Sequence, residues 1–435
     1  MQCQKRKKMK LKLLILFALA SPVLAAQMSL NDCLVYAREH AHRNVINRIE
    51  VKQAAVQSRL AAADLMPTLS LSSNGNISFG RNIDPETNTY DNRKTLYSGF
   101  GLQMSLPLFN GLVSVNNLKS ARAAKLRKTE AARLEEDNIS LEVIRAFYNV
   151  SYCKAMVKQM EEQLERDLTN LQATERGVKL GTKSGADVAE MKALVASDEY
   201  ELTNQKSLLS KAYLLLKSNM GMEPDGNELE LAEEVYEGEA DPGFVHPRIA
   251  EATQGLKECR YNLRAAKGAF SPRISLNAGV STSYYKIFGS EYVNRDFSQQ
   301  WHDNMGQYIG FSVSLPVFTG LSRINRVKKA SLEVSRQESL MDEARYEVER
   351  EKAEAALDLR TATEELTAAR ARVEAEETAY KAIQRKFELG SASAIDLYTS
   401  GTKLATARAN FEGKRIQKII NRILLGYYNG EKLIK

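Results

Sequence analysis

Apolar residues recur every seven positions in two long stretches of the chain that contain no proline. One such series covers 359–387, and the residues 209 positions earlier, over 150–178, are apolar in the same register. A seven-residue period is typical of helices that pack along one another as coiled coils. The pattern therefore predicts two long helices, over 112–178 and 321–388.

Apolar and polar residues alternate in four shorter runs near the prolines. These runs hold Leu69, Leu71, Phe100, Leu102, Met104, Ile274, Leu276, Ile309 and Phe311. A period of two indicates β-strands with different faces, and runs of about ten residues suit tilted strands that cross a bilayer. Polar loops over 81–97 and 286–305 join the runs in pairs. The sequence therefore predicts two β-hairpins, 68–107 and 273–316.

The order of these elements is written twice. The segment S-L-P-L-F-N-G-L at 105–112 returns as S-L-P-V-F-T-G-L at 314–321, and 180–188 has a counterpart at 389–397. Such self-similarity indicates an internal duplication. Shorter helices are expected beside the long ones, over 29–64, 186–220, 246–269 and 394–428. The predicted parts are a first repeat (26–220), an acidic linker or small side element (221–245), a second repeat (246–428) and a C-terminal tail (429–435).

The N-terminus has the composition of a secretory signal peptide, which we predict over 1–25. Six basic residues among the first twelve precede an apolar run and a small-residue end. Cleavage would remove six of the 61 basic residues and leave them nearly balanced by the 54 acidic ones. The basic isoelectric point therefore gives no support for a nucleic-acid partner.

Catalytic, nucleotide-binding and metal-binding motifs are absent from the sequence. It contains no G-x-S-x-G, P-loop or H-E-x-x-H pattern, and its four histidines are scattered. The carboxylates lie on helix faces beside basic residues, as on a solvated surface. We therefore expect no enzymatic activity, no cofactor and no metal.

The predicted strands admit two interpretations. Four strands cannot close a barrel, and open strand edges are not tolerated in lipid, so strands in a membrane would require several chains. A structural periplasmic coiled-coil protein with a soluble β cap would show the same alternation. Aromatic residues near the strand ends, which suit a membrane interface, favour the first interpretation. They are Tyr97, Phe100, Tyr284, Tyr285, Trp301 and Tyr308.

Taken together, these features resemble the TolC-type outer-membrane efflux proteins. The resemblance rests on S-L-N-D-C-L at 29–34, the hairpin, the S-L-P-L-F-N-G joint, and the long helix with L-G and an aspartate at its tip, all but the first repeated. It implies a mixed α and transmembrane β fold: a homotrimer with a twelve-stranded barrel in the outer membrane and a long antiparallel coiled-coil α-barrel in the periplasm. It further implies a passive exit duct fed by a periplasmic adaptor protein and an inner-membrane pump.

The resemblance also implies roles for residues at the helical tips. In that family, an apolar-Gly-small turn contacts the adaptor, and the turns that match it here comprise Leu180, Gly181, Thr182, Leu389, Gly390 and Ser391. Asp396 matches an entrance aspartate, Asp187 is its counterpart in the first repeat, and Thr399 stands at a second aspartate position. The sequence leaves a second role open, because D-x-x-E at 187–190 also reads as a helix-capping box with Asp187 as the cap. No residue pattern names the exported substrate.

Overall fold

The computed structural model describes residues 27–434 except 84–87, 226–227, 233–237 and 290–292. The predicted signal peptide lies outside the described residues. The chain divides into two compact units. The helical unit contains the described parts of 1–47, 133–246 and 348–435, and the strand unit contains those of 48–132 and 247–347. The long helices α4 (Val113–Lys179) and α8 (Ser322–Glu388) contribute to both units and begin and end within one residue of the predicted bounds.

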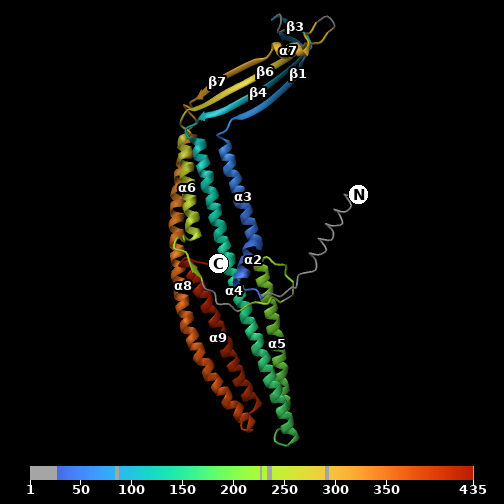
Figure 1. Ribbon diagram of the computed structural model, residues 1–435, viewed down its shortest axis with the longest axis vertical. Helices are drawn as coiled ribbons and strands as arrows, with labels where there is room; N and C mark the ends of the chain where they lie inside the picture. The colour runs from blue at the N-terminus through green and yellow to red at the C-terminus, as the bar shows by residue number, and fades with distance from the viewer. Residues whose placement is uncertain (1–26, 84–87, 226–227, 233–237, 290–292, 435) are drawn as a thin grey trace, which may run out of the picture. The chain divides into compact units, whose positions relative to one another are not determined.

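The strand unit contains a four-stranded antiparallel sheet (Figure 1). Its strands are β1 (Thr68–Ser78), β4 (Thr95–Phe109), β6 (Arg273–Ile287) and β7 (Gly306–Ser314), and they lie in the order β1-β4-β6-β7. Pairing between β4 and β6 joins the two predicted hairpins into one sheet. Strands β1 and β7 therefore form the edges, each paired on one side within the described chain.

Both hairpin loops hold structure that the sequence pattern did not predict. The first contains a small ribbon of β2 (Arg81–Ile83) and β3 (Tyr90–Asn92). The second contains the short helix α7 (Phe297–Asp303), whose N-cap Asp296 accepts a hydrogen bond from the Ser298 N–H at 3.1 Å. Alternation and heptads do not report such short elements, which are set by local caps and by contacts with the sheet.

Polar contacts connect the helices of the strand unit to one another. Helix α3 (His42–Ala63) is joined to α4 by the Glu50–Lys128 ion pair at 2.9 Å. Helix α6 (Pro247–Gly268) is joined to α4 by the Ser120–Asn262 hydrogen bond at 2.7 Å, and to α8 by the Arg260–Glu338 ion pair at 2.9 Å. These contacts bridge neighbouring helices along the coiled coil.

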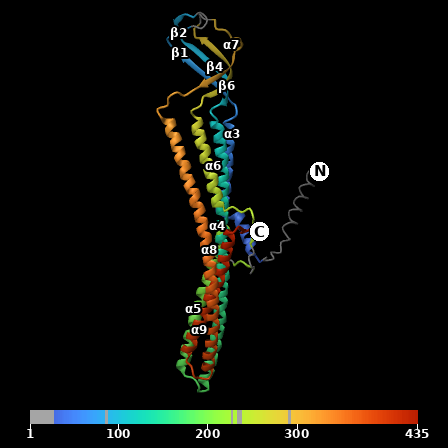
Figure 2. The same ribbon diagram turned by 90° about the vertical axis from the view of Figure 1, so that its left-hand side faces the viewer.

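The helical unit packs parts of α4 and α8 with α2 (Leu30–His40), α5 (Gly185–Met220) and α9 (Ala394–Tyr428) (Figure 2). Its main core includes the fully or nearly fully buried Leu30, Leu34, Val143, Phe147, Leu216, Met220 and Ile423. A smaller second core, nearer the helix turns, consists of Met191, Tyr380, Phe387, Ala394, Leu397 and Leu404. Burial of these side chains, rather than helix propensity, holds the long helices side by side.

The predicted helix over 29–64 is interrupted at Ala41, where the structure has two helices, α2 and α3. Ala41 is buried and extended, with φ −55° and ψ 126°. The C-cap Gly221 of α5 approaches so closely that a Cβ atom there would lie 2.9 Å from the Ala41 Cα. The Asn44 amide donates to the Ala37 carbonyl at 3.3 Å, and the Ala41 N–H donates to the same carbonyl at 2.9 Å. A tertiary contact therefore sets this boundary.

The linker over 221–245 is fastened to both ends of the described chain. Strand β5 (Glu239–Ala240) pairs with β8 (Glu431–Lys432) in the C-terminal tail. The Met28 N–H donates to the Glu230 carbonyl at 2.8 Å, and the Ala232 N–H donates to the Met28 carbonyl at 3.0 Å. Among the described residues, none of the helices combines the length and the apolar composition needed to cross a bilayer.

Candidate functional site: the apolar strand face and the helical tips

The register of the sheet places the apolar residues of all four strands on one face. Leu69 pairs with Met104, which pairs with Ala278, which pairs with Ile309. Side chains alternate along a strand, so every second residue joins the same face. This apolar strand face comprises Leu69, Leu71, Leu102, Met104, Leu106, Leu276, Ala278, Val280, Ile309, Phe311 and Val313.

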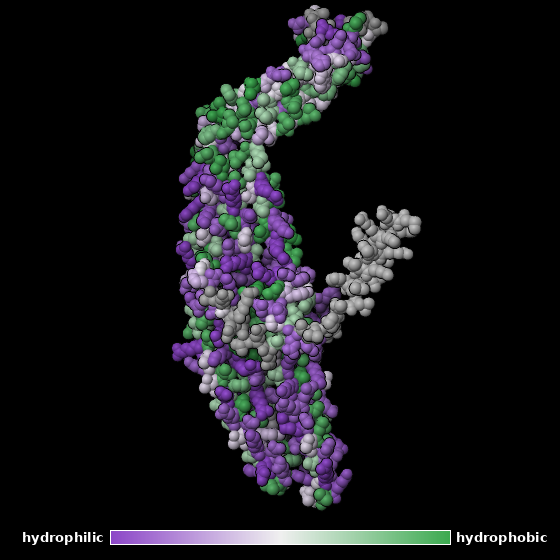
Figure 3. Space-filling view, viewed as in Figure 1, coloured by the Kyte–Doolittle hydropathy of each residue, from purple (hydrophilic) through white to green (hydrophobic). Residues whose placement is uncertain are grey.

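The opposite face of the sheet is polar or small. It presents Ser70, Ser72, Gly101, Gln103, Ser105, Asn277, Gly279, Ser281, Gly310 and Ser312. In a single chain the apolar strand face lies open: Leu71 is 79%, Ile309 76% and Phe311 76% exposed. Figure 3 shows hydrophobic surface over the strands and hydrophilic surface at their loop end. An apolar area this continuous marks a surface that meets lipid or another protein.

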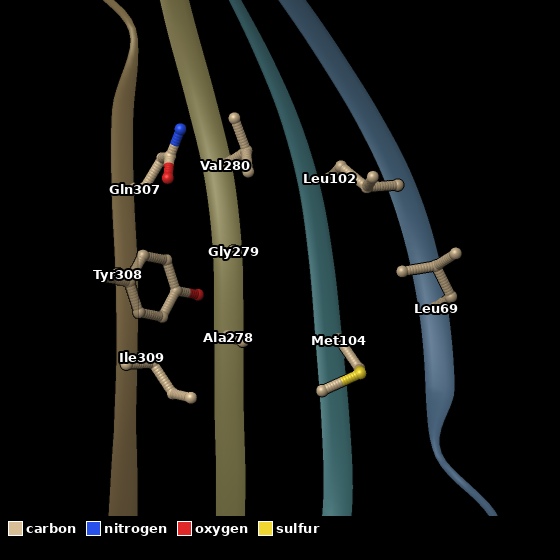
Figure 4. A pocket seen from close by; sticks show the side chains of 9 residues that line it. All are labelled: Leu69, Leu102, Met104, Ala278, Gly279, Val280, Gln307, Tyr308 and Ile309. Carbon is tan, nitrogen blue, oxygen red and sulfur yellow. The ribbon is translucent and has the colours of Figure 1, made fainter.

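Small residues produce an open depression among the strands, with Ala278 and Gly279 at its centre and Leu69, Leu102 and Met104 on one side (Figure 4). On the polar face, the Tyr308 ring covers Gly279, where a Cβ atom would lie 2.6 Å from the ring. Any larger residue would displace that ring. No charged residue lines the depression. We interpret it as an uneven part of the sheet surface and not as a substrate site.

Three of the six aromatic residues predicted to lie at an interface gather at the loop end of the apolar strand face. The Phe100 and Trp301 ring centroids are 5.2 Å apart, and Phe297, which the sequence analysis did not single out, contacts Tyr284 at 5.3 Å and Trp301 at 5.6 Å. Tyr97, Tyr285 and Tyr308 belong to the opposite face by register. The predicted aromatic set is therefore divided between the two faces.

Helix α7 covers the part of β6 that extends beyond β7. The Tyr285 N–H donates to Gln300 Oε1, and Gln300 Nε2 donates to the Tyr285 carbonyl, both at 2.9 Å. Asn294 exchanges two hydrogen bonds with the backbone of Ile287, at 2.7 and 2.9 Å, and the Asn304 amide donates to the Ser283 carbonyl at 2.8 Å. These side chains replace a neighbouring strand, so this stretch of edge is closed to pairing.

The two helical tips are built alike. Gly181 and Gly390 have φ of +75° and +76°, a left-handed conformation that ends α4 and α8 and that favours glycine. The Thr182 hydroxyl donates to the Gly177 carbonyl and the Ser391 hydroxyl to the Lys386 carbonyl, both at 3.1 Å. The small hydroxyl residue of each predicted docking turn thus closes the helix end.

The leucine of each turn makes no comparable contribution to packing. Leu180 is 79% exposed and Leu389 is 76% exposed. A Cβ atom at Gly181 or Gly390 would meet no atom within 4 Å. The turns therefore leave an apolar side chain in solvent next to open space, which is the arrangement of a contact surface.

Both candidate entrance aspartates belong to helix caps, but the capping box differs from the one predicted. Ser184 is the N-cap of α5 and Asp187 is its third helical residue, so the predicted box with Asp187 as the cap is wrong. In α9, Ser393 caps in the same way: its N–H and hydroxyl donate to Asp396 Oδ2 at 3.0 and 2.8 Å. Hydrogen bonds from the cap serines hold the pKa of Asp187 and of Asp396 below its usual value. Thr399 is exposed, one turn beyond Asp396.

A cation–π contact connects the two tips. The Lys183 ammonium, in the turn between α4 and α5, lies 4.3 Å from the centroid of the Phe387 ring near the end of α8. Phe387 is buried in the second core. This contact holds the first turn against the second repeat without a carboxylate.

A buried carboxyl pair, which the sequence analysis missed, lies between α4 and α5. Asp167 and Asp198 are each 5% exposed and hydrogen-bond to each other. Gln163 donates to Asp167, and Arg166 donates to the Gln163 carbonyl oxygen at 3.0 Å. Burial, followed by the hydrogen bond with Asp167 and its charge, raises the pKa of Asp198 to about 7.

We expect Asp198→Asn to stabilise the protein at alkaline pH and to change little below about pH 4. The unfolded carboxyl ionises near pH 4 and the folded one near 7, so the stability of the native chain falls, relative to the variant, as pH rises across this window. The expected gain at pH 8 is on the order of 2 kcal/mol, or a few degrees in melting temperature. Thermal unfolding of both proteins from pH 4 to pH 9 measures it. A difference that does not vary with pH would contradict the raised pKa.

Within the part of the chain that the structure describes, no three histidine, cysteine, aspartate or glutamate side chains gather as ligands for a metal ion. The candidate functional features are therefore the apolar strand face and the two tips.

The model of the family described as "Outer membrane efflux protein" matches the chain twice, over 45–222 and 245–426. The chain belongs to the outer membrane efflux protein family. The two matches follow the two predicted repeats.

Relatives and solved structures agree with this family. The chain is 23% identical over 408 residues to the probable efflux pump outer membrane protein TtgC of Pseudomonas putida, covering 88% of this chain and 80% of TtgC. It is 23% identical to the outer membrane efflux protein BepC of Brucella suis over 84% of this chain and 76% of BepC. The fold is similar to that of CusC, with TM-score 0.80, 18% identity and coverage of 94% and 93%. It is also similar to the outer membrane protein VceC of Vibrio cholerae, with TM-score 0.78, 16% identity and coverage of 93% and 96%.

Proposed function

We propose that three copies of this chain form an outer-membrane channel that serves as the passive exit duct of a tripartite efflux or secretion system. The observation that carries the proposal is the apolar strand face, exposed in one chain and bounded by the open edges of β1 and β7. An open edge and an exposed apolar face are both satisfied when strands of neighbouring chains pair into a closed barrel in lipid.

Three chains are the smallest assembly of this kind that leaves a passage. Two chains would supply eight strands, and side chains would fill the interior of such a barrel. Three chains would supply twelve strands and leave a lumen. In that barrel the apolar strand face would contact lipid, and the polar face, with Ser72, Gln103 and Asn277, would line the lumen. A soluble β cap would instead leave Leu71 and Phe311 in water.

The helical parts would extend into the periplasm as a coiled-coil barrel, and their tips would bind the adaptor protein. The exposed Leu180 and Leu389 support this, since both belong to the turns that match the adaptor-contacting motif. The relatives carry different names, an efflux pump protein for TtgC and a cation efflux system protein for CusC of Escherichia coli. Relatives named for different exported substrates are consistent with a duct whose substrate is selected by its partners. The inner-membrane pump would supply the energy.

Planar bilayers test the channel itself. Purified protein added without a pump or a nucleotide is expected to produce discrete conductance steps. As a control, the variant Phe311→Lys, which places a charge on the apolar strand face, should produce none. Protein that binds vesicles yet never conducts, even with its tips loosened by Lys183→Met, would contradict the proposal.

Asp396→Asn is expected to weaken cation preference with little loss of stability. Asn keeps an oxygen that can accept from the Ser393 N–H, while a trimer would lose three charges that converge at its narrow end. Reversal potentials in a salt gradient measure the preference. The matched variant Ser393→Ala removes the cap and keeps the charge, so it should lower stability by about 1 kcal/mol and leave selectivity unchanged. Unchanged selectivity in Asp396→Asn would assign the carboxylate to capping alone.

A further inference from the structure

Two lysines stand at the loop end of the apolar strand face. Lys286 pairs with Leu96 across β4 and β6, and Lys94, directly before β4, follows the same alternation. The Lys94 ammonium lies 5.2 Å from the Phe79 ring centroid and 4.8 Å from that of Phe288. The Lys286 ammonium lies 5.7 Å from the Phe288 centroid. These four residues, which we name the lysine–phenylalanine rung, extend the face beyond its aromatic group.

The rung is fixed by the backbone as well as by its rings. The Phe288 N–H donates to the Lys94 carbonyl at 3.0 Å, which continues the pairing of β4 and β6 past the end of β6. Within the described chain, neither ammonium forms an ion pair with a carboxylate. Phe79 is 74% exposed and Phe288 37%. The rung therefore presents two positive charges and two apolar rings to its surroundings.

The spacing along the strands places the rung at the edge of a membrane. This step rests on the proposed function, in which the apolar strand face contacts lipid. At about 3.3 Å per residue, the path from Leu106 back to Lys94 is roughly 40 Å. A strand tilt of about 40° reduces it to roughly 30 Å along the membrane normal, against an apolar band of about 25 Å. The ammonium groups then lie just outside the hydrocarbon, at the level of the headgroups.

We propose that the lysine–phenylalanine rung binds the phosphate of an anionic lipid headgroup in the outer leaflet. Two ammonium groups would donate to the phosphate oxygens in charge-assisted hydrogen bonds. The phenylalanine rings and the lysine stems would contact the first carbons of the acyl chains, as amphipathic side chains do at an interface. A lone lysine could reach water by extending its stem, whereas this rung holds two ammonium groups against the same ring, Phe288.

The single tryptophan of the chain reports on this site. Trp301 lies 5.2 Å from Phe100, which the register of β4 places on the same face as the rung. The protein is reconstituted into phosphatidylcholine vesicles that contain a brominated lipid, either phosphatidylglycerol or phosphatidylcholine, and quenching of Trp301 is compared. We expect brominated phosphatidylglycerol to quench at lower mole fraction, with a preference of roughly five-fold for each lysine, the equivalent of about 1 kcal/mol.

Lys94→Met with Lys286→Met should remove this preference while neutral brominated lipid still quenches. The control, Lys328→Met with Lys329→Met, removes two exposed positive charges from α8 and should keep it. An equal preference in both variants would overturn the proposal. Loss of the native protein's preference for phosphatidylglycerol in millimolar inorganic phosphate, but not in chloride of equal ionic strength, would also overturn it. The site would then bind free phosphate. If no brominated lipid quenches Trp301, the strands are not in lipid and the proposed function itself fails.

Discussion

Phe311→Lys is expected to abolish membrane assembly, although Phe311 packs against little in a single chain. Its side chain is 76% exposed and lies on the apolar strand face, where Leu276 connects it by register to Leu106. A lysine facing lipid costs about 1 kcal/mol near the interface and about 2–4 kcal/mol at the midplane, and a trimer carries three copies. In a soluble protein, a charge at so exposed a position would change stability by less than about 0.5 kcal/mol. Fractionation into outer membrane and soluble protein distinguishes the two outcomes.

The neighbouring residue provides the matched control. Ser312 is in the same strand, is also exposed, and lies on the polar face. Ser312→Lys should therefore assemble normally, with its charge in the aqueous lumen. If both variants assemble, or if both fail, the two faces do not face different environments. The assignment of the apolar strand face to lipid and of the polar face to the lumen would then be wrong.

Leu180→Glu combined with Leu389→Glu is expected to stop export while the trimer remains intact. Both leucines are more than three-quarters exposed, so their loss removes almost no packing. An apolar contact buried at an interface is worth 1–2 kcal/mol or more, and its replacement by a charge leaves that charge desolvated. We therefore expect at least a ten-fold loss of adaptor binding. Copurification with the adaptor and the melting temperature of the variant are measured together.

Ala186→Glu separates docking from a general effect of charge. It places the same carboxylate in the first turn of α5, where a negative charge is favourable. This variant should bind the adaptor normally. Equal loss of binding in both proteins would show that the tip rejects any added negative charge, and a fall in melting temperature for the leucine variant alone would assign those side chains to folding.

Features that depend on residues close together in the sequence were predicted, and features that depend on residues far apart were not. Heptads and alternation are local patterns, and they predicted α4, α8 and the strands because a residue's face depends only on its position along its own element. The register then aligned Leu69, Met104 and Ile309, which the alternation of separate strands could not do. The break at Ala41 escaped prediction because its cause, Gly221, lies far along the chain.

The sites show the same division. The turns at Gly181 and Gly390 were predicted from the motif, but the capping box of α5 was placed three residues too late, since S-x-x-D and D-x-x-E overlap at Asp187. The Asp167–Asp198 pair was missed because each residue alone looks like one more carboxylate on an amphipathic helix. Helix α7 was missed because Gln300 and Asn294 acquire meaning only beside the unpaired backbone of β6.

The mass of the purified protein in and out of detergent tests the central proposal most directly. Three chains of 48.7 kDa, less the predicted signal peptides, amount to roughly 140 kDa. Light scattering of the detergent-solubilised protein, corrected for bound detergent, is expected to give this value, with precipitation when the detergent is removed. A monodisperse monomer in buffer alone, with its strands intact by circular dichroism, would contradict the channel and support the soluble β cap.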